Sequence, residues 1–183
     1  MLFRSVSQSR YGNAWVYGDA MVYYKAMVLG NAKVYGNAQI DGYATVLGNA
    51  KVFGNAFVGG CVRVLGNANV YGYAIVEGIT WVCGHAKVYG DSEVHGNNIT
   101  IREDDEIKDN RSYLVFNNTW SSDRQFIYVL SNHRWHVGCF DGTGEELIKK
   151  AYNDSELSGK MYEMYVHFVE QVVKAKQQGI GVR

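Results

Sequence analysis

An aliphatic residue stands at every sixth position along the first half of the chain, from Val16 to Val94 without interruption. A Gly follows two positions after almost every one of them, with Tyr24 as the exception, and a small residue, usually Ala, follows after four. A helix would need apolar residues at a period of 3.6, and Gly and Val are poor helix formers, so the pattern excludes a helix. It predicts short strands separated by turns, in which Gly supplies the positive φ that a turn requires. A fixed short period is typical of a solenoid, whose repeats bury their apolar sides against their neighbours.

The outward positions also repeat, at a distance of 18 residues, which predicts a coil made of three six-residue units. One series is aromatic throughout and has a mainly basic series two residues before it: Tyr17, Tyr35, Phe53, Tyr71 and Tyr89, preceded by Trp15, Lys33, Lys51, Asn69 and Lys87. A second series is largely apolar: Leu29, Leu47, Leu65 and Cys83, preceded by Met27, Thr45, Arg63 and Trp81. We therefore expect residues 18 apart to stack on the same face, with about 4.8 Å between neighbouring strands.

The words VYGNAQ, VLGNAK and VFGNAF resemble those of the hexapeptide-repeat proteins, and the resemblance covers residues 11–98. It implies a left-handed parallel β-helix with three hexads to each triangular coil. The left hand is a property of that family, and it departs from the usual right-handed crossover. We expect a mainly β chain in which residues 1–98 form about five such coils, residues 99–111 form a charged linker, and residues 112–183 form a small α+β unit that acts as a cap or in oligomerisation.

The C-terminal residues have a different pattern, which predicts a short antiparallel sheet and two helices. Strand composition occurs over residues 112–117, 125–130 and 134–140. Thr143 followed by Glu146 is typical of a capping box at a helix start, and apolar residues at helical spacing predict a second helix over 158–177. This unit could dock on the Leu29/Leu47/Leu65 face or on the last coil. Its run WHVGCFDGTGEELI bears a slight resemblance to tails that follow hexapeptide repeats in phage and gut-bacterial proteins, which implies a phage-encoded protein.

Charge and composition exclude several classes of partner. Eighteen basic and eighteen acidic residues give a net charge of zero, so we expect neither nucleic acid nor a membrane as a partner. The N-terminal residues lack an apolar core of signal-peptide length, and no apolar stretch of about 18 residues occurs. We therefore expect a cytoplasmic protein, in the host cytoplasm if it is phage-encoded. Three cysteines without CxxC spacing predict neither a disulfide framework nor a zinc site.

Candidate catalytic residues come from the resemblance to acyltransferases with hexapeptide repeats. These enzymes are typically trimers that bind acyl-CoA between subunits and use a His as general base, which implies His85 or His95 here. The hexads run unbroken, however, so no extruded loop walls an acceptor site. We therefore expect no enzyme activity and no cofactor, with acyl-CoA only under this alternative. His133 and His136 would face opposite sides of a strand, so no metal site is expected.

Two surfaces are candidate interaction sites. The aromatic and basic series either stiffens the sheet or offers a platform to an anionic ligand, a glycan or a protein; its members are Trp15, Tyr17, Lys33, Tyr35, Lys51, Phe53, Tyr71, Lys87 and Tyr89. The apolar series should be covered by the C-terminal helices or by another subunit; its members are Met27, Leu29, Leu47, Leu65 and Trp81. A homo-oligomer is expected, with a trimer first by resemblance.

Three functions follow from these surfaces. The favoured one is a non-catalytic binding or assembly module, which presents rigid faces to a protein partner or to a small anionic ligand at a groove between subunits. The alternatives are a trimeric acyltransferase and a structural protein that stacks end to end.

Overall fold

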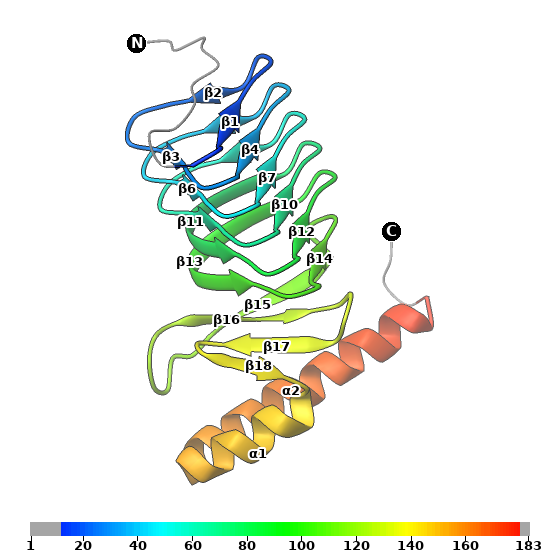
Figure 1. Cartoon of the computed structure of the whole chain (residues 1–183). Helices are drawn as coiled ribbons and strands as arrows, with labels where there is room; N and C mark the ends of the chain where they lie inside the picture. The colour runs from blue at the N-terminus through cyan, green and yellow to red at the C-terminus, as the bar shows by residue number, and fades with distance from the viewer. Residues whose placement is uncertain (1–11, 180–183) are drawn as a thin grey trace.

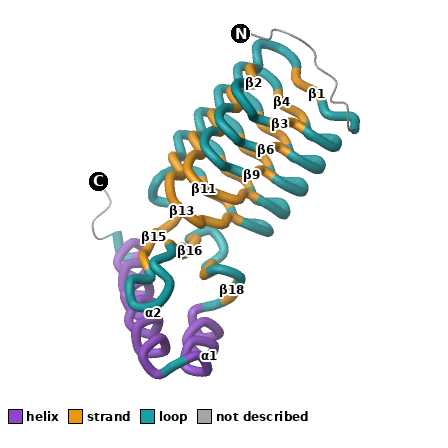
Figure 2. The backbone as a smooth tube through the Cα atoms, turned by 90° about the vertical axis from the view of Figure 1, so that its left-hand side faces the viewer, coloured by secondary structure: helices purple, strands orange, loops and turns teal. Residues whose placement is uncertain are grey.

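The computed structural model describes residues 12–179 and shows a parallel β-solenoid of about five turns, followed by an antiparallel sheet and two helices (Figure 1). The expected mainly β architecture is confirmed. Coils wind around a common axis, and each contributes one short strand to each of three faces (Figure 2). Residues 18 apart pair in parallel, as in Trp15 with Lys33 and Lys33 with Lys51, so the 18-residue coil is confirmed as well.

Three columns of strands make up the faces. The first face consists of β1 (Trp15–Val16), β4 (Lys33–Val34), β7 (Lys51–Val52), β10 (Asn69–Val70), β12 (Lys87–Val88) and β14 (Glu106–Ile107). The second face consists of β3 (Met27–Val28), β6 (Thr45–Val46), β9 (Arg63–Val64) and the ends of β11 (Ile75–Val82) and β13 (Glu93–Ile101). The third face consists of β2 (Met21–Val22), β5 (Gln39–Ile40), β8 (Phe57–Val58) and the beginnings of β11 and β13.

The inward side chains fill the axis of the solenoid. Val34, Val52 and Val70 stack with no exposed surface, and the corner residues Ala32, Ala50 and Ala68 are buried beside them. Burial of a Val side chain contributes about 1.5–3 kcal/mol, so this stack is the main source of stability for the coils. The corners need Gly because the chain turns there with positive φ, 79° at Gly48, and Tyr24 adopts the same conformation at 50° where Gly is missing.

The solenoid extends beyond the boundary expected from the hexads. Ile99, Ile101 and Ile107 lie in the same buried core as the coil valines, so residues 99–107 complete a last coil and are not a linker. Its strand β14 pairs at a distance of 19 residues, Lys87 with Glu106, because an extra residue shifts the register next to Asn98. Asn98 has a φ of 65°. The apolar positions therefore continue one residue out of phase, and a strict six-residue count no longer finds them.

The C-terminal unit has the expected elements with two differences. Its sheet consists of β15 (Tyr113–Asn117), β16 (Gln125–Val129), β17 (Arg134–Val137) and β18 (Phe140–Gly142) in that order, followed by α1 (Gly144–Asp154) and α2 (Glu156–Gln177). The single strand expected over 134–140 is two strands, because the chain turns at Gly138 with a φ of 59°. The second helix begins earlier, after the N-cap Ser155. The capping box of Thr143 and Glu146 is confirmed.

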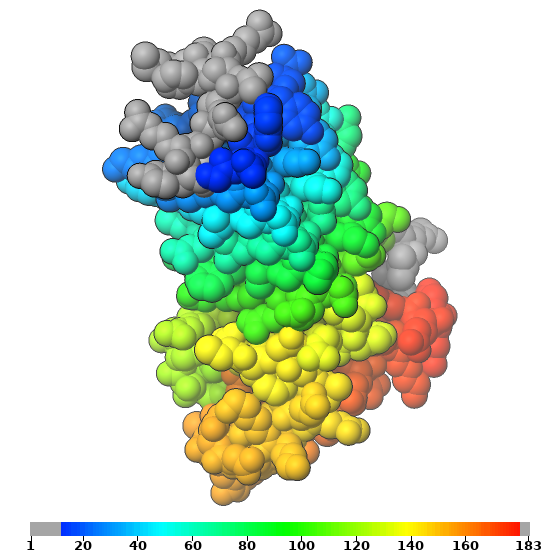
Figure 3. Space-filling view, in the orientation of Figure 1, coloured from blue at the N-terminus to red at the C-terminus, as the bar shows by residue number. Residues whose placement is uncertain are grey.

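The sheet of the C-terminal unit docks on the last coil. Ile127 and Val129 of β16 join the buried core of the solenoid, while Phe126 and Tyr128 on the other side of the same strand pack with α1 and α2. The helices therefore lie on the far side of this sheet, and the sheet sits directly against the coils (Figures 1 and 3). The expectation that the helices might cover the Leu29/Leu47/Leu65 face is wrong, because their apolar side is used by the sheet. Within the described residues, no helix has the length and apolar character needed to span a membrane.

Candidate functional site

The aromatic series on the first face forms a continuous stack. Ring centroids of Tyr17, Tyr35, Phe53, Tyr71 and Tyr89 follow one another at 4.9–5.1 Å, with interplanar angles of 2–6°. Each inner ring is covered on both faces by its neighbours, so only ring edges point outward. The series therefore does not offer ring faces to a ligand or to a cation. Its geometry favours the interpretation that it stiffens the sheet.

The basic series runs beside this stack and ends in an ion pair. Lys33, Lys51 and Lys87 are exposed, as is Trp15 at the other end of the column. Lys87 Nζ donates to Glu106 Oε1 at 2.7 Å, and the hydroxyl of Tyr89 lies 3.4 Å from the other oxygen of this carboxylate. The hydrogen bond to Glu106 raises the pKa of Lys87 and lowers that of Glu106. Glu106, on the last coil, thus contacts the last residue of the basic series and the last residue of the aromatic series.

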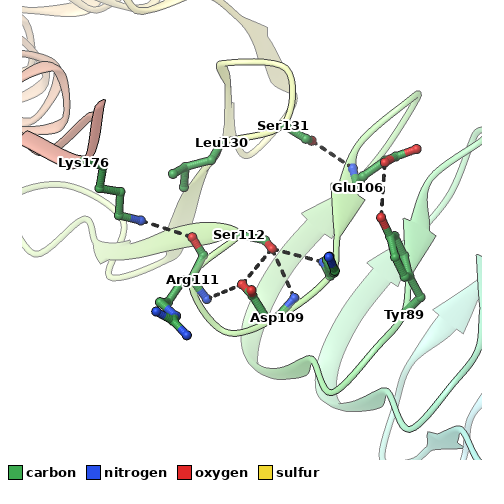
Figure 4. Close-up of a pocket in the computed structure, with 9 residues that line it drawn as sticks. Tyr89, Glu106, Asp109, Arg111, Ser112, Leu130, Ser131 and Lys176 are labelled. Carbon is green, nitrogen blue, oxygen red and sulfur yellow. Dashed lines mark hydrogen bonds between the residues drawn. The ribbon is translucent and has the colours of Figure 1, made fainter. Parts of the chain in front are cut away.

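A hollow of about 560 Å³ lies where the first face meets the C-terminal unit (Figure 4). Several of its polar groups are bonded to one another: Asp109 Oδ1 accepts from the Ser112 hydroxyl at 3.0 Å and from the Arg111 backbone at 2.9 Å. Lys176 Nζ, from the end of α2, donates to the Arg111 carbonyl at 3.2 Å. These bonds hold the connection between coil and sheet, and the hollow has the character of a structural junction.

A larger groove, of about 940 Å³, runs along the second face and ends against two loops of the C-terminal unit. We call it the cap groove. Its floor and sides come from stacked coil positions: Met27, Tyr43, Thr45, Cys61, Arg63, Ile79, Trp81, Cys83 and residues 98–100. Its end wall comes from the last coil and from the C-terminal unit: Arg102, Glu103, Arg124, Gln125, Gly138 and Cys139. Met27, Ile79 and Trp81 are 48%, 44% and 42% exposed in it. The groove therefore combines a partly apolar floor with a polar end.

Arginine dominates the charge of the cap groove. Arg63 lies over the Trp81 ring at 5.2 Å from its centroid, and Arg102 Nη2 donates to the Gly138 carbonyl at 3.1 Å. No carboxylate of residues 12–179 forms an ion pair with Arg63, Arg102 or Arg124, although Glu103 also lines the groove. Three guanidinium groups face one carboxylate, so the groove favours anionic ligands.

The structure divides the predicted apolar series between two places. Met27 and Trp81 line the cap groove, whereas Leu29, Leu47 and Leu65 form the neighbouring column outside it. Leu29 and Leu65 are half-buried, and Leu47 is exposed. The series predicted as one surface is thus divided between the floor of the cap groove and a separate leucine column.

The two candidate general bases lie apart from the cap groove. His85 ends a column of corner amides, in which Asn31, Asn49 and Asn67 are hydrogen-bonded in sequence and Asn67 Nδ2 lies 3.1 Å from His85 Nε2. His95 lies on the third face, with Nδ1 at 3.2 Å from Glu77 and Nε2 at 3.7 Å from Glu93. His85 thus occupies a structural position at a corner, and both nitrogens of His95 face carboxylates.

The structure separates the two histidines of the C-terminal unit. His133 lies in the turn before β17, where its Nδ1 is 2.6 Å from the Tyr128 hydroxyl. His136 is buried beneath the sheet, with Nε2 at 2.7 Å from Asp105 Oδ2. No group of three His, Cys, Asp or Glu residues in the described part of the chain could hold a metal ion.

Sequence reasoning missed both Asp105 and the end wall of the cap groove. Asp105 occupies the corner position that Ala14, Ala32, Ala50, Ala68 and Ala86 hold in the coils above, so a phase-corrected alignment of the hexads would have marked it as an anomaly. Arg124 and Cys139 carry no such signal, because only the folding of the sheet brings these distant loops to the groove.

Comparison of the chain with protein-family models, curated proteins and solved structures gives no match.

Proposed function

We propose that this chain is a non-catalytic binding module whose ligand site is the cap groove. The observation that carries the proposal is the pairing of an exposed apolar floor, at Met27, Ile79 and Trp81, with three arginines that form no ion pair among the described residues. Ligand sites are typically concave and mostly apolar, with a few polar groups that set orientation. A ligand with an apolar body and a negative charge fits this description.

The rigidity of the scaffold supports a binding role. Every coil is held to the next by a parallel backbone ladder, and stacked rings and amide columns reinforce the outer surface. A surface that is already ordered loses little conformational entropy when a ligand binds. The solenoid therefore suits a fixed recognition surface better than a site that must close around a substrate.

The dye 8-anilinonaphthalene-1-sulfonate tests this proposal, since it joins an apolar ring system to an anion. Arg63→Glu and Trp81→Ala should each weaken its binding by about tenfold, measured by fluorescence titration. Lys51→Glu makes the same charge change on the first face and should leave the affinity unchanged. Equal binding by all four proteins would overturn the cap groove as the site.

The two other functions remain weaker candidates. An acyltransferase would use acyl-CoA with His85 or His95, and neither residue lines the cap groove. Calorimetric binding of acetyl-CoA, together with acetyl transfer that is lost in His85→Ala or His95→Ala, would favour the enzyme. End-to-end stacking is less favoured because the C-terminal sheet covers the last coil.

A homo-oligomer, with a trimer first, is part of the proposal and rests on the resemblance to hexapeptide-repeat proteins. The leucine column is the expected contact, since Leu47 is exposed there and lies outside the cap groove. Sedimentation should therefore show an oligomer that Leu47→Glu weakens. A monomer at micromolar concentration would reject this assembly. A cytoplasmic location, in a phage host if the protein is phage-encoded, is likewise proposed.

A further inference from the structure

The cap groove has the dimensions of an extended chain. Its central column runs through the register partners Met27, Thr45, Arg63, Trp81 and Thr100, one from each coil. Four steps of about 4.8 Å give a length of about 19 Å. An extended peptide advances about 3.3 Å per residue, so about six residues would span the column. A compact ligand would fill only part of such a length.

Apolar and basic side chains follow one another along the groove. Met27 and Tyr43 offer apolar surface at the end far from the cap, and Ile79 and Trp81 offer it near the cap. Arg63 lies between these two regions, and Arg102 and Arg124 lie at the end wall. Successive side chains of an extended peptide point to opposite sides, so only every second residue faces this floor, and those residues would have to be apolar and acidic in turn.

Two features argue against a single-stranded nucleic acid as the ligand. Single-stranded nucleic acids bind where aromatic faces are free to stack on bases, but one face of Trp81 is already covered by the Arg63 guanidinium. The aromatic rings of the first face are stacked on one another and present only their edges. The planar fork of arginine binds a carboxylate through two parallel hydrogen bonds, and this contact needs no free aromatic face.

We propose that the cap groove binds an extended peptide of about six residues, with acidic side chains toward Arg63, Arg102 and Arg124 and large apolar side chains toward Met27 and Trp81. This inference rests on the proposed function and specifies its ligand. The peptide lies along the solenoid axis, and the two loops of the C-terminal unit stop it at one end. Cys61 and Cys139 border the same groove and are exposed.

A labelled peptide of about eight residues with the repeat Phe-Ser-Glu-Ser, called the Phe-Glu peptide, tests the inference by fluorescence anisotropy, because Phe and Glu then follow one another on the same side of the extended chain. The full-length protein should bind it, and the affinity should fall as salt rises, because exposed charges are screened. A peptide with Lys in place of Glu should bind at least about tenfold more weakly. Arg63→Glu and Arg124→Glu should each cost about tenfold, whereas the charge-matched control Lys51→Glu should cost nothing.

Thiol protection gives a second readout that does not depend on the charge variants. Saturating peptide should slow alkylation of Cys61 and Cys139, measured by mass spectrometry. Three results would overturn the inference: no binding of the Phe-Glu peptide, binding that Arg63→Glu leaves intact, or tighter binding of an oligothymidylate of equal length. If Arg63→Glu instead dissociates an oligomer, the groove binds a second copy of the chain and the peptide inference is overturned. If the dye binds as proposed but the peptide does not, the ligand class is wrong while the site stands.

Discussion

Nε2 of His136 lies 2.7 Å from Oδ2 of Asp105, and both side chains are almost completely buried, at 1% and 0% exposure. Asp105 belongs to the last coil and His136 to strand β17, so this contact joins the solenoid to its cap. The carboxylate also accepts from the Arg102 backbone at 2.8 Å and from Asn132 Nδ2 at 2.6 Å. The imidazole and the carboxylate are in contact at ion-pair distance, although neither His136 nitrogen has a hydrogen-bond partner among the described residues.

Removal of this carboxylate should loosen the cap. Asp105→Ala restores the Ala of the corner stack but leaves the buried imidazole and the half-buried Asn132 amide without this partner. Loss of one member of a buried pair costs about 3–5 kcal/mol in the free energy of unfolding, which urea denaturation followed by tryptophan fluorescence would measure. Asp104→Ala changes the exposed neighbour and should cost almost nothing. A cost below about 1 kcal/mol for Asp105→Ala would contradict the joining role.

The aromatic stack should matter for stability and not for ligand binding. Phe53 is stacked on Tyr35 and on Tyr71, so Phe53→Ala removes two aromatic pairs. Each pair contributes about 0.5–1.5 kcal/mol to the free energy of unfolding, beyond the contribution of the apolar area that it buries. Phe53→Tyr keeps both pairs and should be nearly neutral. Thermal unfolding measures the first effect, and titration with the Phe-Glu peptide should give the same affinity for all three proteins. A stable Phe53→Ala variant that no longer binds would instead make the first face the binding surface.

The ion pair of Lys87 and Glu106 predicts a pH dependence of stability. The hydrogen bond from Lys87 lowers the pKa of Glu106 in the folded state, so the unfolded chain takes up a proton first as the pH falls. The pair thus stabilises the fold above the ordinary glutamate pKa of about 4.3, and this contribution is lost as the pH falls through the lower folded value. Urea denaturation in this range should show a flatter pH profile for Glu106→Gln.

Lys87→Met should flatten the same profile, because it removes the other partner. Both side chains are exposed, so high salt should bring the wild type close to the two variants. If salt leaves the wild-type pH profile unchanged, the loss of stability in acid arises from another carboxylate.

The corner glycines should differ from the glycine of the cap turn. At Gly48, with a φ of 79°, an added Cβ would lie 3.0 Å from the Gly66 carbonyl oxygen of the next coil. At Gly138, with a φ of 59°, no atom lies within 4 Å of an added Cβ. Gly138→Ala should therefore cost only the backbone term of about 1–2 kcal/mol, and Gly48→Ala should cost clearly more in a chemical denaturation series. Equal losses would mean that close packing between coils adds nothing.

The solenoid was predictable from the sequence because its contacts are periodic. Every inward Val packs against residues 18 positions away, so the same demand recurs in each coil and appears as a count in the chain. The stacking of Tyr17 through Tyr89 followed from the same count. The count failed next to Asn98, where one extra residue moved Ile101 and Ile107 out of phase and hid the last coil.

The cap groove was decided by the tertiary structure alone. Trp81 and Met27 could be assigned to one face from their spacing, but Arg124 and Cys139 reach that face only because β16 docks on the last coil. Asp105 and His136 meet for the same reason. Such contacts occur once and join segments of unlike pattern, so no repeat reveals them. Periodic burial fixed the scaffold, and a single docking of sheet on coil placed the arginines beside the apolar floor.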